Sequence, residues 1–71
     1  MIFNDRVKAL RIEKKLTQTQ VAEASGMILR SYQRLEKDAK PHYESLMNLA
    51  DFFDVSVDYL MGRTDKREVN R

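Results

Sequence analysis

The side chains best suited to recognising another molecule lie on one face of a predicted helix at residues 28–37. That face carries Leu29, Arg30, Gln33 and Arg34. An arginine can donate two parallel hydrogen bonds to the edge of guanine, a glutamine can pair with adenine in the same way, and a leucine can touch the methyl group of thymine. The residue types and their spacing therefore indicate contact with base edges in DNA.

Tyr32 and Leu35 lie on the opposite face of the same predicted helix, at a spacing that packs both side chains inward. An ordinary amphipathic helix with a solvated outer face shows the same division, so the helix alone does not decide its role. A role in DNA contact requires a second element that holds this helix against the body of the protein and leaves its outer face exposed.

Such an element precedes it, because a short helix is predicted over residues 18–24. Thr17, followed three residues later by Gln20, forms a capping box in which each side chain satisfies a free backbone N–H. Residues 25–27 then form a tight turn, since Gly26 can adopt the left-handed backbone conformation that redirects the chain. Two short helices joined by a three-residue glycine turn are the arrangement that projects a second helix into the major groove of DNA.

The rest of the chain is predicted to form three more helices, so the fold class is all-α. The first is capped by Asn4, runs to about residue 14 and turns inward an apolar stripe formed by Phe3, Val7, Ala9 and Leu10. The fourth covers residues 43–53 and stops at Asp54. Ser56 caps a last short helix at residues 57–61.

Length, charge and composition narrow the function classes. A chain of 71 residues makes one small domain, and with no cysteine and one histidine it has neither disulfides nor the usual metal cluster. Residues 1–41 hold nine basic and five acidic side chains, a net charge of +4, whereas residues 42–71 hold four and six, a net charge of −2. A basic half suits an anionic partner such as nucleic acid. We expect no metal and no cofactor.

The sequence also predicts where the protein works. Residues 1–6 lack the apolar core of a signal peptide, and no stretch approaches the roughly 18 apolar residues of a membrane span. The absence of cysteine fits a reducing compartment. We therefore expect a soluble, cytoplasmic protein with no membrane partner.

The segment Leu16-Thr17-Gln18-Thr19-Gln20-Val21-Ala22-Glu23-Ala24-Ser25-Gly26-Met27 resembles the helix-turn-helix of the Cro/C1-type (Xre) family. Arg34-Leu35-Glu36 resembles the basic, apolar, glutamate signature of that family. The segment ending Asp54-Val55-Ser56-Val57-Asp58-Tyr59-Leu60-Met61-Gly62 resembles its last two helices. The resemblance implies a compact five-helix, lambda-repressor-like DNA-binding domain over residues 1–64. Residues 65–71 are assigned to a polar tail, and the polar residues 63–71, which follow Gly62 at the end of the last helix, are expected to be frayed.

The resemblance also implies roles for individual residues. Family members read bases from the outward side of the third helix, which here carries Leu29, Arg30, Gln33 and Arg34. They contact backbone phosphates from the start of the second helix and from the loop after the third, which here hold Thr17, Gln18, Lys37 and Lys40. Arg11 and Glu36 resemble a pair that joins the first and third helices, so both are expected to be scaffold residues.

A domain of this size reads only a few base pairs, and relatives gain affinity by pairing on two half-sites. We therefore expect a homodimer on double-stranded DNA. The contact between the two copies is expected in the C-terminal region, at Val57, Tyr59, Leu60 and Met61.

Three residues depart from the family pattern. Ile28 stands where relatives usually place a capping residue, so we expect the third helix to begin without a side-chain cap, at a cost of about 1 kcal/mol. Lys15 and Asp38 replace glycines that are common at two turns, so each is expected to hold a left-handed backbone. Asp38 also places an acid near the expected phosphates.

These features predict a transcriptional regulator, most simply a phage-type repressor that binds a palindromic operator. The rival interpretation is an antitoxin or anti-regulator that acts mainly by holding a protein partner through the apolar side chains of Met47, Phe52, Tyr59 and Met61. An enzyme is not expected, because the sequence offers no nucleophile beside a base, no phosphate-binding glycine loop and no paired metal ligands.

Overall fold

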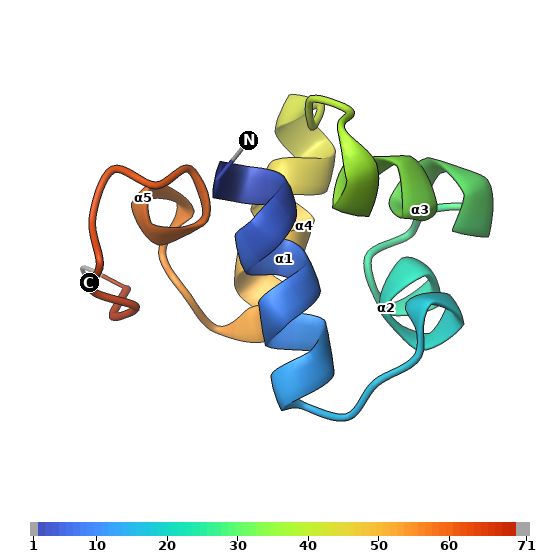
Figure 1. The fold of residues 1–71 in the computed structure, drawn as a ribbon, viewed down its shortest axis with the longest axis horizontal. Coiled ribbons are helices and arrows are strands. Elements are labelled where there is room, and N and C mark those ends of the chain that lie inside the picture. The colour runs from blue at the N-terminus through green and yellow to red at the C-terminus, as the bar shows by residue number, and fades with distance from the viewer. Residues whose placement is uncertain (1, 70–71) are drawn as a thin grey trace.

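The computed structural model describes residues 2–69, which form helices and turns without any strand. The helices are α1 (Ile2–Glu13), α2 (Gln18–Ala24), α3 (Leu29–Lys37), α4 (Tyr43–Phe53) and α5 (Val57–Leu60). In Figure 1, α1 and α4 occupy the middle of the molecule, with α2 and α3 on one side and α5 on the other. The predicted all-α class is confirmed. None of the helices in the described part is long and apolar enough to cross a membrane.

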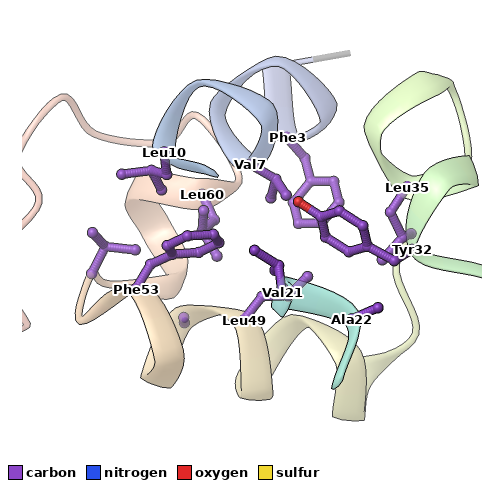
Figure 2. Close-up of a cluster of buried hydrophobic side chains, with 12 residues drawn as sticks. Phe3, Val7, Leu10, Val21, Ala22, Tyr32, Leu35, Leu49, Phe53 and Leu60 are labelled. Atoms are coloured by element: carbon purple, nitrogen blue, oxygen red, sulfur yellow. The ribbon is translucent and has the colours of Figure 1, made fainter. Parts of the chain in front are cut away.

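The core draws apolar side chains from every one of these helices, and Figure 2 shows them pointing toward one another. Burying a large aliphatic or aromatic side chain of this kind contributes about 1.5–3 kcal/mol to folding. Ala9 was expected in this cluster, but its side chain is exposed, because the position falls outside the stripe that α1 turns inward. The buried set is Phe3, Val7, Leu10, Val21, Ala22, Tyr32, Leu35, Leu49, Ala50, Phe53, Val55 and Leu60.

Asn4 caps the end of α3 and not the start of α1. Helix α1 begins at Ile2, so Asn4 lies within it and is buried, with 1% of its surface exposed. Its Nδ2 donates to the carbonyl oxygens of Leu35, at 2.5 Å, and Ala39, at 2.9 Å. The carbonyl of Leu35 belongs to the last turn of α3, where helical partners run out. The prediction of Asn4 as a helix N-cap was therefore wrong.

Among the described residues, two that are not glycine have a left-handed backbone. Lys15 has a φ of 58°, as predicted, and Asp54 has a φ of 54° where it ends α4. Asp38 does not, because its φ is −154°, and the prediction for it was wrong. The N–H groups of Asp38 and Ala39 both donate to the carbonyl of Arg34, which closes α3 without a left-handed residue.

The chain beyond α5 folds back against α1 and α5. The guanidinium of Arg67 donates to both carboxylate oxygens of Glu13, at 2.8 and 3.1 Å. The backbone carbonyl of Arg67 accepts a hydrogen bond from the N–H of Ser56. Arg6 donates to Thr64 O and to Asp65. These contacts place residues 64–67 beside α1 and α5. Residues 1, 70 and 71, at the ends of the two predicted ranges, lie outside the described residues.

Candidate nucleic-acid interface

Helix α3 is held by one face and open on the other. Tyr32 and Leu35 are buried against the core, with 0% and 4% of their surface exposed. Arg30, Gln33 and Arg34, from the set predicted to read bases, are all exposed. The fourth member of that set, Leu29, is the first residue of α3 and is 39% exposed. The structure therefore places the four predicted residues at the accessible side of one short helix.

The helix that positions α3 begins with the predicted capping box. The hydroxyl of Thr17 accepts from the N–H of Gln20 at 3.0 Å, and the N–H of Thr17 donates to Gln20 Oε1 at 2.8 Å. This local exchange fixes the start of α2 and confirms the box. The hydroxyl proton of Thr17 is still free to donate to a phosphate oxygen, because the oxygen uses only a lone pair in the cap.

An ion pair between Arg11 and Glu36 joins α1 to α3. Arg11 Nε donates to Glu36 Oε2 at 2.5 Å, and Nη2 donates to Oε1 at 3.1 Å. Both side chains are shielded, with 15% of Arg11 and 4% of Glu36 exposed. Arg11 Nη1 also donates to the carbonyl of Leu16, so the pair anchors the turn that leads into α2. These contacts make the pair a scaffold for the two-helix unit.

The carboxylate of Glu36 keeps its charge in this setting. Burial raises the pKa of Glu36, but hydrogen bonds from Arg11 and Gln18 stabilise the anion, and the net effect is a lowered pKa. The group therefore stays an acceptor at neutral pH, which lets it orient both of its donors.

A chain of side-chain hydrogen bonds extends from this pair to the outer face of α3. Gln18 Nε2 donates to Glu36 Oε1 at 3.2 Å, and Gln33 Nε2 donates to Gln18 Oε1 at 3.1 Å. Because an amide nitrogen has two protons, Gln33 retains one N–H and its carbonyl oxygen, the pair of groups that matches an adenine edge. Gln18, predicted to contact a phosphate, is thus hydrogen-bonded to Gln33, predicted to read a base.

An open hollow lies where α1, α2 and α3 meet. It brings together three of the predicted phosphate contacts, Thr17, Gln18 and Lys37, and the predicted base reader Gln33. It is also lined by Lys8, which was not among the residues predicted from the sequence. Lys8 lies three residues before Arg11 and so shares a face of α1 with it, which is the signal that could have found it.

A second hollow lies on the other flank of α3, between α3 and the start of α4. Arg34, a predicted base reader, and Lys40, a predicted phosphate contact, both line it, together with His42. Cations therefore flank α3 on both sides, with Lys8 and Lys37 at one hollow and Arg34 and Lys40 at the other. Such a distribution suits a polyanion that passes over the helix.

The four residues predicted to join two copies differ in how far their side chains are exposed. Leu60 is fully buried, so it cannot contact a second copy, and this part of the prediction was wrong. The ring of Tyr59 is covered by the guanidinium groups of Arg6, 4.2 Å from its centroid, and Arg67, 5.4 Å from it. Val57 is half-buried and Met61 is 38% exposed, so these two offer most of the accessible apolar surface of the set.

Two short helices joined by a tight turn, the second with an exposed face of arginine and glutamine, define a helix-turn-helix domain. The family model described as helix-turn-helix matches residues 7–60. The chain belongs to the Cro/C1-type helix-turn-helix family of DNA-binding transcriptional regulators.

Among curated proteins, the chain is similar to three regulators from two bacteria. YobD, an uncharacterised HTH-type transcriptional regulator of Bacillus subtilis, is 42% identical over 65 residues, which cover 90% of this chain and 58% of that protein. YqaE, a second such regulator of Bacillus subtilis, is 36% identical over 61 residues, or 84% and 53% of the two chains. The cryptic phage CTXphi transcriptional repressor RstR of Vibrio cholerae is 34% identical over 71 residues, or 96% and 63%.

The chain thus spans 53–63% of the length of these relatives. No solved structure matches it significantly.

Proposed function

We propose that this protein represses transcription by binding a palindromic operator as a dimer, with α3 of each copy in the major groove. The observation that carries the proposal is the outer face of α3. Arg30, Gln33 and Arg34 are exposed together, while the opposite face of the helix is fixed in the core. A rigid helix with outward donors and acceptors is what direct reading of base edges requires.

The proposed phosphate contacts lie on both flanks of this helix. Thr17, Gln18, Lys37 and Lys8 line one hollow, and Lys40 lines the other. Contacts of this kind fix the register of a protein on the duplex and make its affinity depend on salt, because each neutralised phosphate releases counterions. Asp38 lies exposed between Lys37, the last residue of α3, and Lys40 in the α3–α4 loop, and it limits how closely that loop approaches a phosphate.

The hydrogen-bonded chain from Arg11 to Gln33 supports a precise placement of the reading groups. Gln33 is held by Gln18, Gln18 by Glu36, and Glu36 by a bidentate arginine. A glutamine that is oriented before DNA arrives loses less rotamer freedom on binding, so more of its contact energy appears as affinity.

A dimer is proposed because one α3 covers only a few base pairs, whereas two copies bind half-sites about 34–36 Å apart on one side of the duplex. The accessible apolar surface near α5, at Val57 and Met61, is the proposed contact between copies. The name of RstR, a transcriptional repressor, supports repression as the outcome. The proposed location is the cytoplasm, where a regulator of this family meets DNA.

Selection of bound duplexes from a random-sequence pool tests the proposal. We expect a palindromic sequence whose half-sites are about one helical turn apart, two copies bound per duplex, and a reporter silenced when that sequence overlaps its promoter. Protection of a single half-site by one copy would contradict the dimer. An increase in reporter output would contradict repression.

The second candidate is a protein-binding role, and a specific observation favours it. Three apolar side chains that are not proposed DNA contacts are each 37–38% exposed: Met47 and Phe52 on α4, and Met61 directly after α5. Exposed apolar side chains of this size are typical of protein contacts when they form a patch. This candidate replaces the first if selection recovers no duplex and if Arg30→Ala binds the same partners as the parent protein.

A further inference from the structure

We propose that Ile28 is a specificity-determining residue that recognises the C5-methyl group of thymine. The inference rests on the proposed function and deepens it, because it names one chemical group that the α3 interface requires. It concerns a residue outside the four predicted to read bases, at the point where the turn enters α3.

Ile28 is unusually exposed for its type. It has 70% of its surface accessible, against 51% and 56% for the exposed isoleucines Ile2 and Ile12 of α1. No part of the described structure therefore uses the bulk of this side chain for packing. Its neighbour Leu29 is also exposed, at 39%, so two branched aliphatic side chains project at the leading end of α3.

The position of Ile28 in the helix makes an isoleucine there costly for local stability. The residue is the N-cap of α3, with a φ of −75° and a ψ of 152°, and its side chain makes no capping hydrogen bond. Serine, threonine or aspartate in the same backbone conformation would satisfy a free N–H of the first turn. The isoleucine gives up that bond and gains no burial in return, so the folded chain alone does not account for it.

The charges around Ile28 indicate which partner would cover it. Arg30 follows two residues later on the exposed side of α3, and the first turn contains no acidic residue. This end of the helix therefore suits a polyanion and lacks the mixed charge of a protein-binding rim. The N-terminal residues of a recognition helix are those that meet base edges. The apolar group displayed there by duplex DNA is the thymine methyl.

The experiment compares thymine with uracil, which lacks only that methyl. The duplex recovered by selection is synthesised with each thymine replaced in turn, and binding of the full 71-residue chain is measured. We expect about a fourfold loss of affinity at one or two positions of each half-site, the effect of one buried methyl-sized group. Uracil at the remaining positions should bind like the parent duplex, except at a thymine that Leu29 contacts, where the loss should persist in Ile28→Ser.

The variant Ile28→Ser separates recognition from folding. It should bind the parent duplex about fourfold more weakly and lose its sensitivity to uracil at the same positions. Its melting temperature should rise by about 4 °C, because the serine supplies the missing cap. Ile12→Ser is the matched control: it changes an exposed isoleucine near the end of α1, away from the start of α3 (Figure 1), and should keep full uracil sensitivity.

Three outcomes would overturn the inference. These are tight binding with no uracil effect, unchanged affinity of Ile28→Ser, or an Ile28→Ser variant that still discriminates thymine from uracil at the same positions. Failure to bind any duplex would overturn the proposed function as well, so the two failures are distinguishable.

Discussion

Gln33 donates a hydrogen bond to Gln18 at 3.1 Å, across the two helices of the helix-turn-helix. The contact joins a side chain on the outer face of α3 to one at the first residue of α2. Because Gln18 also donates to Glu36, the single amide group of Gln18 links the outer face of α3 to the Arg11–Glu36 pair.

The first prediction concerns this coupling. Gln18→Ala should weaken binding to the selected duplex about tenfold, because it removes a phosphate contact and frees Gln33 to rotate. It should also reduce discrimination at the base pair that Gln33 contacts. Thr19→Ala, at the next exposed position of α2, is the matched control and should change neither.

A double-mutant cycle with Gln33→Ala measures the link. We expect a coupling free energy of about 0.5–3 kcal/mol, as for residues in one hydrogen-bonded network. Strictly additive losses would show that the two glutamines act independently on DNA.

The second prediction concerns the scaffold pair. Glu36→Ala should lower the free energy of unfolding by about 3 kcal/mol, because it leaves the shielded guanidinium of Arg11 without its partner. Glu23→Ala removes an exposed carboxylate of α2 and should cost no more than about 0.5 kcal/mol. Urea unfolding followed by circular dichroism checks both values. Equal stability of the two variants would show that the pair contributes nothing net.

The third prediction follows from the lowered pKa of Glu36. A carboxyl whose folded pKa lies below its unfolded value of about 4.3 stabilises the protein fully above that value, and the contribution is lost as the pH falls through the folded pKa. The free energy of unfolding should therefore drop more steeply below about pH 4.3 in the parent protein than in Glu36→Gln. The two proteins differ in one carboxyl group only. If their free energies of unfolding change in parallel from pH 7 to pH 3, the lowered pKa of Glu36 is contradicted.

The fourth prediction separates base contacts from phosphate contacts. Arg30→Ala or Arg34→Ala should cost about 1–3 kcal/mol on the selected duplex and relax preference at one base position, a guanine by the chemistry of the side chain. Lys40→Ala should weaken binding similarly on every sequence and lower the salt slope by about one unit. Isotherms on selected and scrambled duplexes at several salt concentrations distinguish the two patterns. Full discrimination by both arginine variants would show that α3 does not read bases.

The fifth prediction concerns the buried amide of Asn4. Asn4→Ala should destabilise the protein by about 2 kcal/mol, because the carbonyls of Leu35 and Ala39 lose their donor inside the fold. Asp5→Ala, at the exposed neighbouring position, should stay within about 0.5 kcal/mol of the parent. A melting temperature of Asn4→Ala equal to that of Asp5→Ala would mean that water replaces the amide.

Local interactions made much of the fold predictable from the sequence. The capping box of Thr17 and Gln20, the limits of α4 at Tyr43 and Phe53, and the left-handed Lys15 all appear as predicted. Each depends on residues within about four positions of one another, so residue type and spacing carry the necessary information. The exposed face of α3 was predictable from residue spacing for the same reason.

The tertiary structure decided what depends on residues far apart in the chain. Asn4 and Leu35 are separated by 31 positions, and Arg67 and Glu13 by 54, so no local pattern indicates either contact. Leu60 was predicted from the sequence to contact a second copy, but its packing in the core leaves it no exposed surface. The sequence determined which helices form and, for α2, α4 and α5, where they begin. Which side chains are free at their surfaces was decided by how the helices pack, because burial is a property of the assembled core.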